Sequence, residues 1–374
     1  MMTIHIITSL NDGGAEAVLF RLCTHDLNHR HIVVSLSGEG KYGTLLRERG
    51  IEICVLKMSP NLPSLFAFFK LIKLIRRYKP DVVQTWMYHA DLLGGIAARM
   101  AGIKAIVWGI HHTTLEPGKS KRTTIWIVKL LARLSWWLPA RIVVCAQRAM
   151  DVHEELGYNR AKMSFIPNGY DLEDFTPMPN EARALRSEWG VEPGIFLIGT
   201  VARYNPQKDH ANLLQALALL RSRNIPLRCV LTGLNLDSDN QELVAQIQRL
   251  GLEEMVILLG KRTDIPSVMS ALDVHVLPSA YGEAFPNVVA EAMACETTCV
   301  VTDVGDAAYI VGNTGWVVPP GDSNALANAI EKSLNETKHD QWAIRCTSTR
   351  ERIQKNFSIK KIVKLYHELW SKLL

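Results

Sequence analysis

The sequence lacks the features that mark disulfide-rich, membrane-spanning or secreted chains. Its seven cysteines are scattered, and the closest pair, Cys295 and Cys299, has neither zinc-type spacing nor a second pair to complete four ligands. We therefore expect reduced thiols. Lys or Arg interrupts every apolar run before about 18 to 20 residues, which predicts no bilayer-spanning helix. The first ten residues have no basic region or small-residue cleavage site, so we expect no signal peptide.

Composition and length are those of a two-domain globular protein. Hydrophobic residues make up 48% of the chain and charged residues 21%, with no low-complexity tract or internal repeat. A chain of 374 residues exceeds what one hydrophobic core usually serves, so we expect two domains of about 150 to 200 residues each. We expect no nucleic-acid partner.

Short apolar runs alternate with amphipathic stretches in both halves of the chain. Expected strands cover residues 4–9, 32–36, 53–56, 82–84, 105–108 and 142–145, then 195–200, 228–232, 256–259, 274–278 and 298–302. Expected helices in the first half cover 15–27, 44–49, 65–78, 90–100 and 123–138. This alternation favours parallel sheets covered on both faces, with ligands at the carboxyl ends of the strands. The sequence therefore predicts an α/β fold of two Rossmann-like domains that face each other across a cleft.

A stretch with prolines and acids at residues 171–180 indicates the linker between the domains. Residues 1–175 would form the N-terminal domain and residues 176–355 the C-terminal domain. Residues 356–374 would form a final helix, whose apolar positions suggest that it crosses back to the N-terminal domain. These positions are Ile362, Val363, Leu365, Tyr366, Leu369 and Trp370.

Positive charge is concentrated in the first half. Residues 1–175 carry 22 Lys and Arg against 15 Asp and Glu, a net +7, which leaves −2 for the rest of a chain of net charge +5. Two segments without acids, 57–80 and 117–150, mix these cations with aromatic residues at helical spacing. Such a pattern favours contact with anionic lipid, although aromatics packed in the core beneath solvated cations would look the same. The second segment includes Lys121, Arg122, Trp126, Lys129, Arg133, Trp136 and Trp137.

The most informative stretch is SAYGEAFPNVVAEAMA at residues 279–294. A strand ends just before it, a loop carries Gly282 and Glu283, and a helix is expected to start near Asn287 with Glu291 about one turn later. Free backbone N–H groups at a helix start, together with the helix dipole, favour a diphosphate. Glu283 would then face a sugar hydroxyl, and Glu291 could reach ribose hydroxyls.

This segment resembles the donor-binding signature of retaining glycosyltransferases of family 4, a group with the GT-B fold. Three other places agree with the family pattern: the glycine loop at residues 11–16, the segment at 199–209 with Arg203 and Lys208, and His112 after the expected strand at 105–108. The four matches occur in order over essentially the whole chain. The neighbouring His111 is the alternative to His112.

The resemblance implies roles for individual residues. Both cations would neutralise the diphosphate as the bond to the sugar breaks, and His112 would contact the transferred sugar. The implied catalytic set is Glu283, His112, Arg203 and Lys208. The implied donor-binding set is Gly13, Gly14, Arg203, Lys208, Gly233, Arg262, Glu283, Asn287, Val288 and Glu291.

Two other motifs are weaker indications. Residues 38–43 fit the dinucleotide fingerprint G-x-G-x-x-G but follow the second strand, and the next strand ends in Lys57 where an acid is needed to bind ribose. Asp237 and Asp239 spell the metal-diphosphate motif D-x-D. Because Arg203 and Lys208 would already supply positive charge, we expect neither a metal nor another cofactor.

Together these patterns predict a cytoplasmic, retaining hexosyl- or N-acetylhexosaminyltransferase associated peripherally with the inner membrane. It would move a sugar such as GalNAc from a UDP-sugar to a polyprenyl-diphosphate-linked saccharide in O-antigen or other surface polysaccharide synthesis. GDP-mannose as donor and a soluble acceptor stay open as alternatives. An NAD-dependent sugar-nucleotide enzyme is a remote one, since no first-strand fingerprint is present, and a silent sugar-binding protein would not need Glu283, Arg203 and Lys208.

Overall fold

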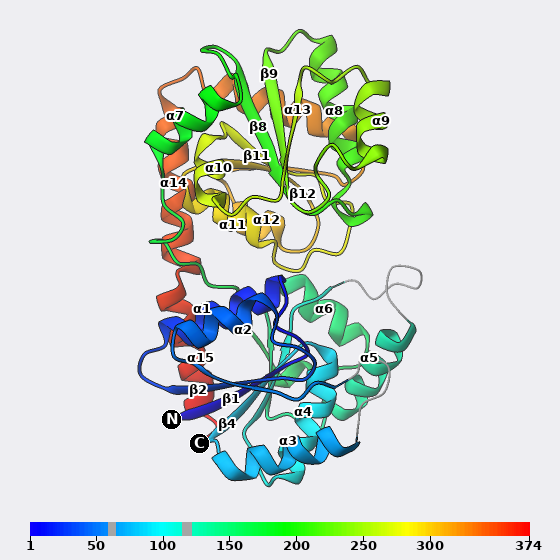
Figure 1. Ribbon diagram of the computed structural model, residues 1–374, viewed down its shortest axis with the longest axis vertical. Helices are drawn as coiled ribbons and strands as arrows, with labels where there is room; N and C mark the ends of the chain where they lie inside the picture. Colours follow the sequence, from blue (N-terminus) through cyan, green and yellow to red (C-terminus); the bar gives the residue numbers. More distant parts are fainter. Residues whose placement is uncertain (59–64, 114–121) are drawn as a thin grey trace. The chain divides into compact units, whose positions relative to one another are not determined.

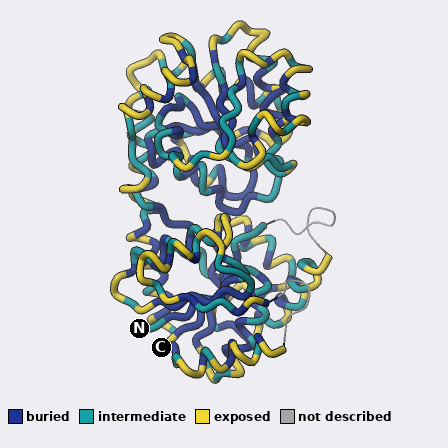
Figure 2. The backbone as a smooth tube through the Cα atoms, in the orientation of Figure 1, coloured by how far each residue is buried: buried dark blue, intermediate teal, exposed yellow. Residues whose placement is uncertain are grey.

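The computed structural model describes residues 1–58, 65–113 and 122–374. It divides the chain into two compact units, one made of Met1–Gly169 with Ile359–Leu374, and the other of Tyr170–Ser358 (Figure 1). We call them unit 1 and unit 2. Figure 2 shows that buried residues follow the strands of each unit, whereas exposed residues follow the outer helices and loops.

Unit 1 is built on a seven-stranded parallel sheet of order β3-β2-β1-β4-β5-β6-β7. The strands are continuous apolar runs, as expected when helices cover both faces. Helix α1 packs against both α2 and α15, and α4 contacts both α3 and α5. The strands are β1 (Met2–Ile7), β2 (Arg30–Ser35), β3 (Glu52–Val55), β4 (Val82–Trp86), β5 (Ile106–Ile110), β6 (Arg141–Val144) and β7 (Met163–Phe165). The helices are α1 (Gly14–His25), α2 (Gly40–Glu48), α3 (Leu65–Tyr78), α4 (Tyr88–Met100), α5 (Arg122–Leu134), α6 (Gln147–Glu155), the short η1 (Arg160–Lys162) and α15 (Ile359–Ser371).

The final helix α15 is part of the core of unit 1. Its apolar face places Ile362, Tyr366 and Trp370 among the buried residues of α1 and the central strands. The indole N–H of Trp370 donates to Gln84 Oε1 at 3.3 Å, so α15 is also joined to β4 by a buried hydrogen bond. The end of the chain is therefore needed to complete the fold of its beginning.

Unit 2 has a six-stranded parallel sheet of order β10-β9-β8-β11-β12-β13. Its strands are β8 (Phe196–Val201), β9 (Leu227–Thr232), β10 (Val256–Gly260), β11 (Val274–Leu277), β12 (Thr298–Thr302) and β13 (Trp316–Val318). Its helices are α7 (Pro179–Glu188), η2 (Pro206–Lys208), α8 (His210–Ser222), α9 (Gln241–Arg249), α10 (Ile265–Ala271), α11 (Asn287–Ala294), α12 (Ala307–Val311), α13 (Ser323–Glu336) and α14 (Gln341–Phe357).

In both sheets the strand order reverses beside the first strand of the unit. This topological switch point lies between β1 and β4 in unit 1 and between β8 and β11 in unit 2. Doubly wound sheets bind ligands at the carboxyl ends of the strands flanking this point. The topology therefore directs attention to the loops that follow these four strands.

The predicted α/β class with two Rossmann-like domains is confirmed, with differences in detail. Two three-residue edge strands, β7 and β13, were not expected, because so few residues show no period of their own. The units divide after Gly169 and after Ser358, whereas the sequence placed the divisions at residues 175 and 355. No helix in the described ranges is long and apolar enough to cross a bilayer.

Candidate active site

The candidate site in unit 2 lies where two loops meet at the switch point of the sheet. The loop after β8 leads into η2, and the loop after β11 leads into α11. The backbone N–H of Ala280 donates to Gln207 O at 2.9 Å and joins the two loops. Gly282 has φ +78°, a conformation in which L side chains are strained, and a Cβ there would lie 3.0 Å from the Gln207 side chain, so glycine is favoured.

The two loops bring together the ammonium of Lys208 and the carboxylate of Glu283. Lys208 Nζ lies 2.5 Å from Glu283 Oε1, and the Ser279 hydroxyl donates to the same oxygen at 2.7 Å. The exposed fractions of the two side chains are 15% for Lys208 and 8% for Glu283. A mostly buried pair of this kind interacts more strongly than a surface pair and holds both groups in one geometry.

Capping interactions on both sides fix the backbone at Lys208. Asn205 Oδ1 accepts from the N–H of Gln207 at 3.0 Å and starts η2. Asp209 takes the left-handed conformation, with φ +46°, and its carboxylate accepts from Asn212 N at 3.2 Å at the start of α8. Lys208 thus lies between two turns that are fixed by side-chain hydrogen bonds, and these turns pre-organise its position.

Helix α11 begins beside this pair without a side-chain cap. Pro286 is its N-cap residue, and the first N–H groups of any helix have no partner within the helix. The Tyr170 hydroxyl donates to Asn287 Oδ1 at 2.8 Å, which orients the first helical residue. Glu291 lies half-buried one turn later. The amides at Asn287 and Val288 and the positive end of the helix dipole form an arrangement suited to an anion.

Three further predicted donor residues lie on neighbouring loops of unit 2. Gly233 has φ +144°, and a Cβ there would lie 1.7 Å from Ala202 O, so only glycine permits this approach of the loop after β9. Arg203 is exposed directly after β8. Arg262 Nη2 lies 2.5 Å from Asp264 Oδ2, and its guanidinium carbon lies 5.7 Å from the centre of the Trp189 ring. The sequence did not predict these contacts of Arg262.

The predicted residues of unit 1 follow β1 and β5. Gly13 is the N-cap of α1 and Gly14 its first residue. A Cβ at Gly13 would lie 2.4 Å from Glu16 Oε2, so this carboxylate occupies the turn. Burial raises the pKa of Glu16 above its usual value, an effect that hydrogen bonds to its own N–H and to Ser9 oppose. The sequence alone did not indicate a role for Glu16.

The two histidines after β5 have different surroundings. The His111 ring stacks on Trp86, with ring centres 5.1 Å apart. Burial lowers the pKa of His111 to about 4, so this imidazole is neutral at physiological pH. His112 is half-buried in the loop that follows. The packing of His111 favours His112 as the residue that contacts a ligand, which stays a prediction.

The two weaker motifs have structural roles. Asp237 Oδ1 accepts from the N–H of Asp239 at 3.2 Å and closes the turn between β9 and α9. Gly40, inside the G-x-G-x-x-G match, has φ +53° and begins α2, and a Cβ there would lie 2.4 Å from Leu10 O. These contacts give residues of both motifs a role in local backbone geometry.

Cations and aromatic side chains of α5 and of the turn after it lie on the surface. We call this the basic aromatic face, made of Arg122, Trp126, Lys129, Arg133, Trp136 and Trp137. The exposed fractions are 65% for Trp126, 56% for Trp136 and 75% for Trp137, whereas Val128 and Leu131 on the same helix are buried. These tryptophans are therefore not core residues. The predicted Lys121 lies outside the described residues.

Two doubly wound domains, with a cation and a carboxylate at the switch point of the second sheet, are consistent with a glycosyltransferase of the GT-B fold. Comparison with known families agrees. Residues 12–174 match the family described as Glycosyltransferase Family 4, and residues 182–356 match the one described as Glycosyl transferases group 1. Together the two models cover most of the chain, one for each domain and in order, and they identify it as a glycosyltransferase.

Characterised relatives resemble the chain over most of its length. An Escherichia coli UDP-Gal:alpha-D-GlcNAc-diphosphoundecaprenol alpha-1,3-galactosyltransferase is 28% identical over 84% of this chain and 80% of its own. An N,N'-diacetylbacillosaminyl-diphospho-undecaprenol alpha-1,3-N-acetylgalactosaminyltransferase from Campylobacter jejuni is 24% identical over 88% of this chain and 89% of its own. Among solved structures, Anabaena HepE in complex with UDP covers all of both chains with a TM-score of 0.88 and 26% identity.

Proposed function

We propose that the chain transfers a hexose or N-acetylhexosamine, such as GalNAc, from a UDP-sugar to a polyprenyl-diphosphate-linked saccharide with retention at the anomeric carbon. The observation that carries the proposal is the Lys208–Glu283 pair at the switch point of unit 2, held at 2.5 Å beside the uncapped start of α11. One group of the pair suits a diphosphate and the other suits a sugar hydroxyl.

The proposed chemistry breaks the bond between the anomeric carbon and a diphosphate oxygen. Negative charge grows on the departing diphosphate, and Lys208, Arg203 and the amides at the start of α11 stabilise it. The carboxylate of Glu283 accepts a hydrogen bond from a hydroxyl of the sugar and keeps the sugar ring in place. The acceptor oxygen attacks from the same face and passes its proton to the leaving phosphate, which preserves the configuration without a covalent enzyme intermediate.

The substrates for which relatives are named support the choice of donor and acceptor. HepE has been solved with UDP-glucose as well as with UDP, and this complex covers all of both chains at 26% identity. The Escherichia coli and Campylobacter jejuni relatives are both named for undecaprenyl-diphosphate acceptors, one as a galactosyltransferase and the other as an N-acetylgalactosaminyltransferase. These names favour a UDP-sugar and a lipid-linked acceptor here, in surface polysaccharide synthesis.

A lipid-linked acceptor requires the protein to work at a membrane surface. The basic aromatic face offers three exposed tryptophans together with three exposed cations. Tryptophan favours the interface of a bilayer, and cations favour anionic headgroups. A second acid-free surface on α3 exposes Phe66 and Phe69 beside Lys70 and Lys73. We propose that the protein is cytoplasmic and docks on the inner membrane through these surfaces.

A transfer assay tests the proposed reaction. The purified chain is incubated with a synthetic polyprenyl-diphosphate sugar and, in separate reactions, with UDP-Gal, UDP-GalNAc, UDP-GlcNAc, UDP-Glc and GDP-mannose. We expect transfer from at least one UDP-sugar, and an axial anomeric linkage in the product by NMR. Transfer from GDP-mannose alone would contradict the choice of nucleotide, and an inverted linkage would contradict retention.

Vesicle binding tests the proposed docking surface. We expect the chain to sediment with phosphatidylglycerol vesicles at low salt and to be released at high salt, since the Debye length shortens from about 10 Å at 0.1 M to about 3 Å at 1 M. Changing Arg122, Lys129 and Arg133 to Glu should weaken binding more than about 100-fold, at about 1 kcal/mol or more for each cation.

The matched control changes three exposed cations of unit 2, Arg183, Arg249 and Lys332, to Glu. This variant has the same net charge as the first one, and we expect it to retain most of the vesicle binding. Equal loss in both variants would show that total charge, and not the basic aromatic face, governs binding. If the wild-type chain ignores anionic vesicles, a soluble acceptor becomes the better hypothesis.

A further inference from the structure

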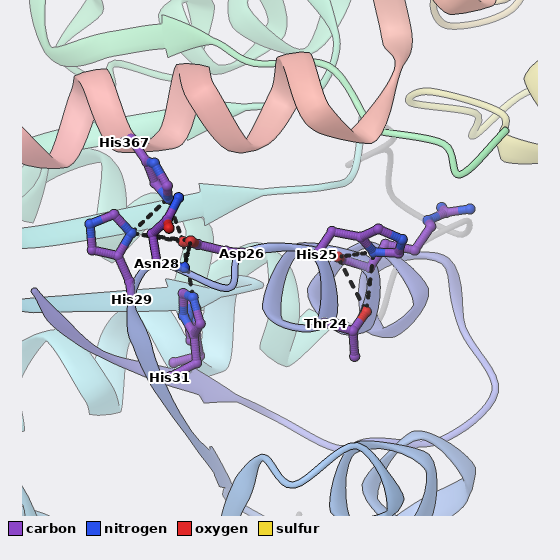
Figure 3. A network of polar contacts seen from close by, with 9 residues as sticks. Thr24, His25, Asp26, Asn28, His29, His31 and His367 are labelled. Carbon is purple, nitrogen blue, oxygen red and sulfur yellow. Dashed lines mark hydrogen bonds and ion pairs between the residues drawn. The ribbon is translucent and has the colours of Figure 1, made fainter. Parts of the chain in front are cut away.

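A second group of polar side chains lies entirely in unit 1 and plays no part in the proposed reaction. It consists of Asp26, His29, His31 and His367, which we call the Asp26 cluster (Figure 3). Asp26 is the C-cap of α1, His29 lies in the turn that follows, His31 lies on β2, and His367 lies on α15. Figure 3 shows His29, His31 and His367 pointing toward the Asp26 carboxylate.

The contacts within the cluster are short. His29 Nδ1 lies 3.1 Å from both oxygens of Asp26, and His31 Nε2 lies 3.0 Å from Oδ2. His367 Nε2 also contacts Oδ2. In addition, His29 Nδ1 and His367 Nε2 face each other at 2.9 Å. Only one proton fits between two ring nitrogens, so at least one of them directs a lone pair into the cluster.

A buried relay determines the role of His31. The indole N–H of Trp86, which can only donate, lies 3.2 Å from His5 Nδ1. Burial, with a contribution from His31, keeps the pKa of His5 well below its usual value, so neutral His5 carries its proton on Nε2. That proton points to His31 Nδ1 at 2.9 Å. His31 Nδ1 therefore accepts this proton, and the other ring nitrogen, Nε2, lies 3.0 Å from Asp26 Oδ2.

This assignment separates His31 from the other two histidines. His31 is engaged with His5 through Nδ1, and its buried ring lies against the carboxylate, a position typical of the outer partners of metal ligands. His29 Nδ1 and His367 Nε2, with an oxygen of Asp26, are the atoms that can bind a cation, and all three lie within 4.8 Å of one another. Two imidazoles and one carboxylate form a ligand set typical of open zinc sites.

Distance and charge are both compatible with zinc. Bonds of about 2.0 to 2.2 Å in a tetrahedral site place ligand atoms roughly 3.3 Å apart, against the 2.9 and 3.1 Å found here. These two pairs need only small ring rotations, whereas His367 Nε2 and Asp26 Oδ2 lie closer together and have to separate when the ion binds. Asp26 supplies the acidic oxygen of the set, and nitrogen atoms of His29, His31 and His367 all lie close to it.

The cluster is also accessible from one side. The Asp26 and His31 side chains are fully buried, whereas 18% of His29 and 20% of His367 is exposed. A cation could thus reach the ligand atoms past the two imidazoles, and a water molecule could complete its coordination. The oriented carboxylate would lie at the inner end of the site.

A neighbouring group of potential ligands, His5, Cys23 and His31, has the opposite character. All three are buried, and burial raises the pKa of the Cys23 thiol well above its usual value, with a smaller effect of Asp26. Both nitrogens of His5 already take part in the relay with Trp86 and His31. This group therefore supports the Asp26 cluster and does not form a site of its own.

We propose that Asp26, His29 and His367 bind one Zn²⁺ per chain, with His31 orienting the carboxylate. The ion would connect the turn between α1 and β2 with α15, whose His367 lies 341 positions after Asp26. Its role would be structural, since it would hold the C-terminal helix in the core of unit 1. The residues proposed to bind the nucleotide diphosphate belong to unit 2, so this inference stands apart from the proposed reaction.

Zinc binding to the tag-free full chain provides the test. After treatment with EDTA and its removal, the chain is dialysed against buffered Zn²⁺, and bound metal is measured by atomic absorption. We expect one Zn²⁺ per chain in the wild type, and a loss of affinity of at least about 100-fold in His29→Ala and His367→Ala. His339→Ala, which removes an exposed histidine of unit 2, is the matched control and should bind like the wild type.

Two measurements on the wild-type chain test zinc binding without depending on whether the variants fold. Co²⁺ in place of Zn²⁺ should produce the visible absorption of a four-coordinate site, and Zn²⁺ should displace it. Zn²⁺ should also slow hydrogen exchange in α15, because a ligand that binds only the folded form stabilises it. A wild-type chain that binds no zinc, or His29→Ala and His367→Ala variants that bind it as tightly as the control, would overturn the proposal.

Discussion

Replacing Glu283 by Gln keeps the shape of the side chain but removes its charge. In the folded protein Glu283 Oε1 accepts from Lys208 at 2.5 Å and from Ser279 at 2.7 Å. Hydrogen bonds to charged groups contribute about 1.5 to 3 kcal/mol each. The amide oxygen of Gln still accepts one of them, so we expect the free energy of unfolding to fall by about 1 to 3 kcal/mol. The variant should therefore fold.

Catalysis should suffer more than stability. A carboxylate that orients the sugar while the anomeric bond breaks contributes to the transition state, so Glu283→Gln should lower kcat about 100-fold, which corresponds to about 2.7 kcal/mol. UDP alone carries no sugar, and the carboxylate repels its diphosphate. We therefore expect Glu283→Gln to bind UDP as tightly as the wild type or more tightly, whereas Lys208→Met should bind it more weakly.

The assay combines steady-state transfer, UDP titration by calorimetry and thermal unfolding. Glu253→Gln is the matched control, since Glu253 is an exposed carboxylate of the same unit, and it should leave all three measurements unchanged. A folded Glu283→Gln variant with the kcat of the wild type at saturating substrates would refute the proposed role of the carboxylate. Weaker UDP binding in this variant would show that Glu283 supports the diphosphate and not the sugar.

Three further predictions concern charge. Lys208→Ala should raise the activation free energy that corresponds to kcat/KM by about 3 kcal/mol. Unchanged transfer rates would show that the diphosphate binds elsewhere. EDTA should leave the transfer rate nearly unchanged at 25 °C; a strict requirement for Mg²⁺ or Mn²⁺ would return attention to Asp237 and Asp239. Burial raises the pKa of Asp91 to about 8 from its ordinary 3.8, although hydrogen bonds from Thr85 and Gly109 oppose this rise. Between about pH 4 and pH 8 the unfolded chain therefore binds fewer protons than the folded chain, and stability falls as the pH rises. Asp91→Asn should thus melt above the wild type at pH 7 but not near pH 4, and parallel pH profiles in circular dichroism melts would contradict a neutral Asp91.

Much of the fold could be predicted because the relevant signals are local. Alternation of apolar runs with amphipathic stretches predicted the central strands of both sheets, since hydrophobic period and length depend only on neighbouring residues. The short strands β7 and β13 were missed for the same reason, because three residues show no period. The loop and helix at residues 279–294 could be recognised because the Gly, Glu, Pro and Asn of this motif lie within one short segment of the chain.

The sequence by itself therefore determined the fold class and pointed to Lys208 and Glu283 separately. Only the tertiary structure decided that these two residues, 75 positions apart, form a pair through Ser279 and the meeting of two loops. It also decided that Trp126 and Trp137 lie on the surface. A helical period shows which residues share a face, but the neighbouring elements decide which faces are covered.

The Asp26 cluster belongs wholly to this second category. His29 and His31 lie close to Asp26 in the sequence, but an isolated D-x-x-H-x-H pattern in a turn is too common to indicate a metal. The third ligand, His367, is 338 positions beyond His29 and reaches it only because the apolar face of α15 packs in the core of unit 1. Local sequence determines that α15 is an amphipathic helix, and the shape of the core it completes determines which polar residues on its flank meet the rest of the chain.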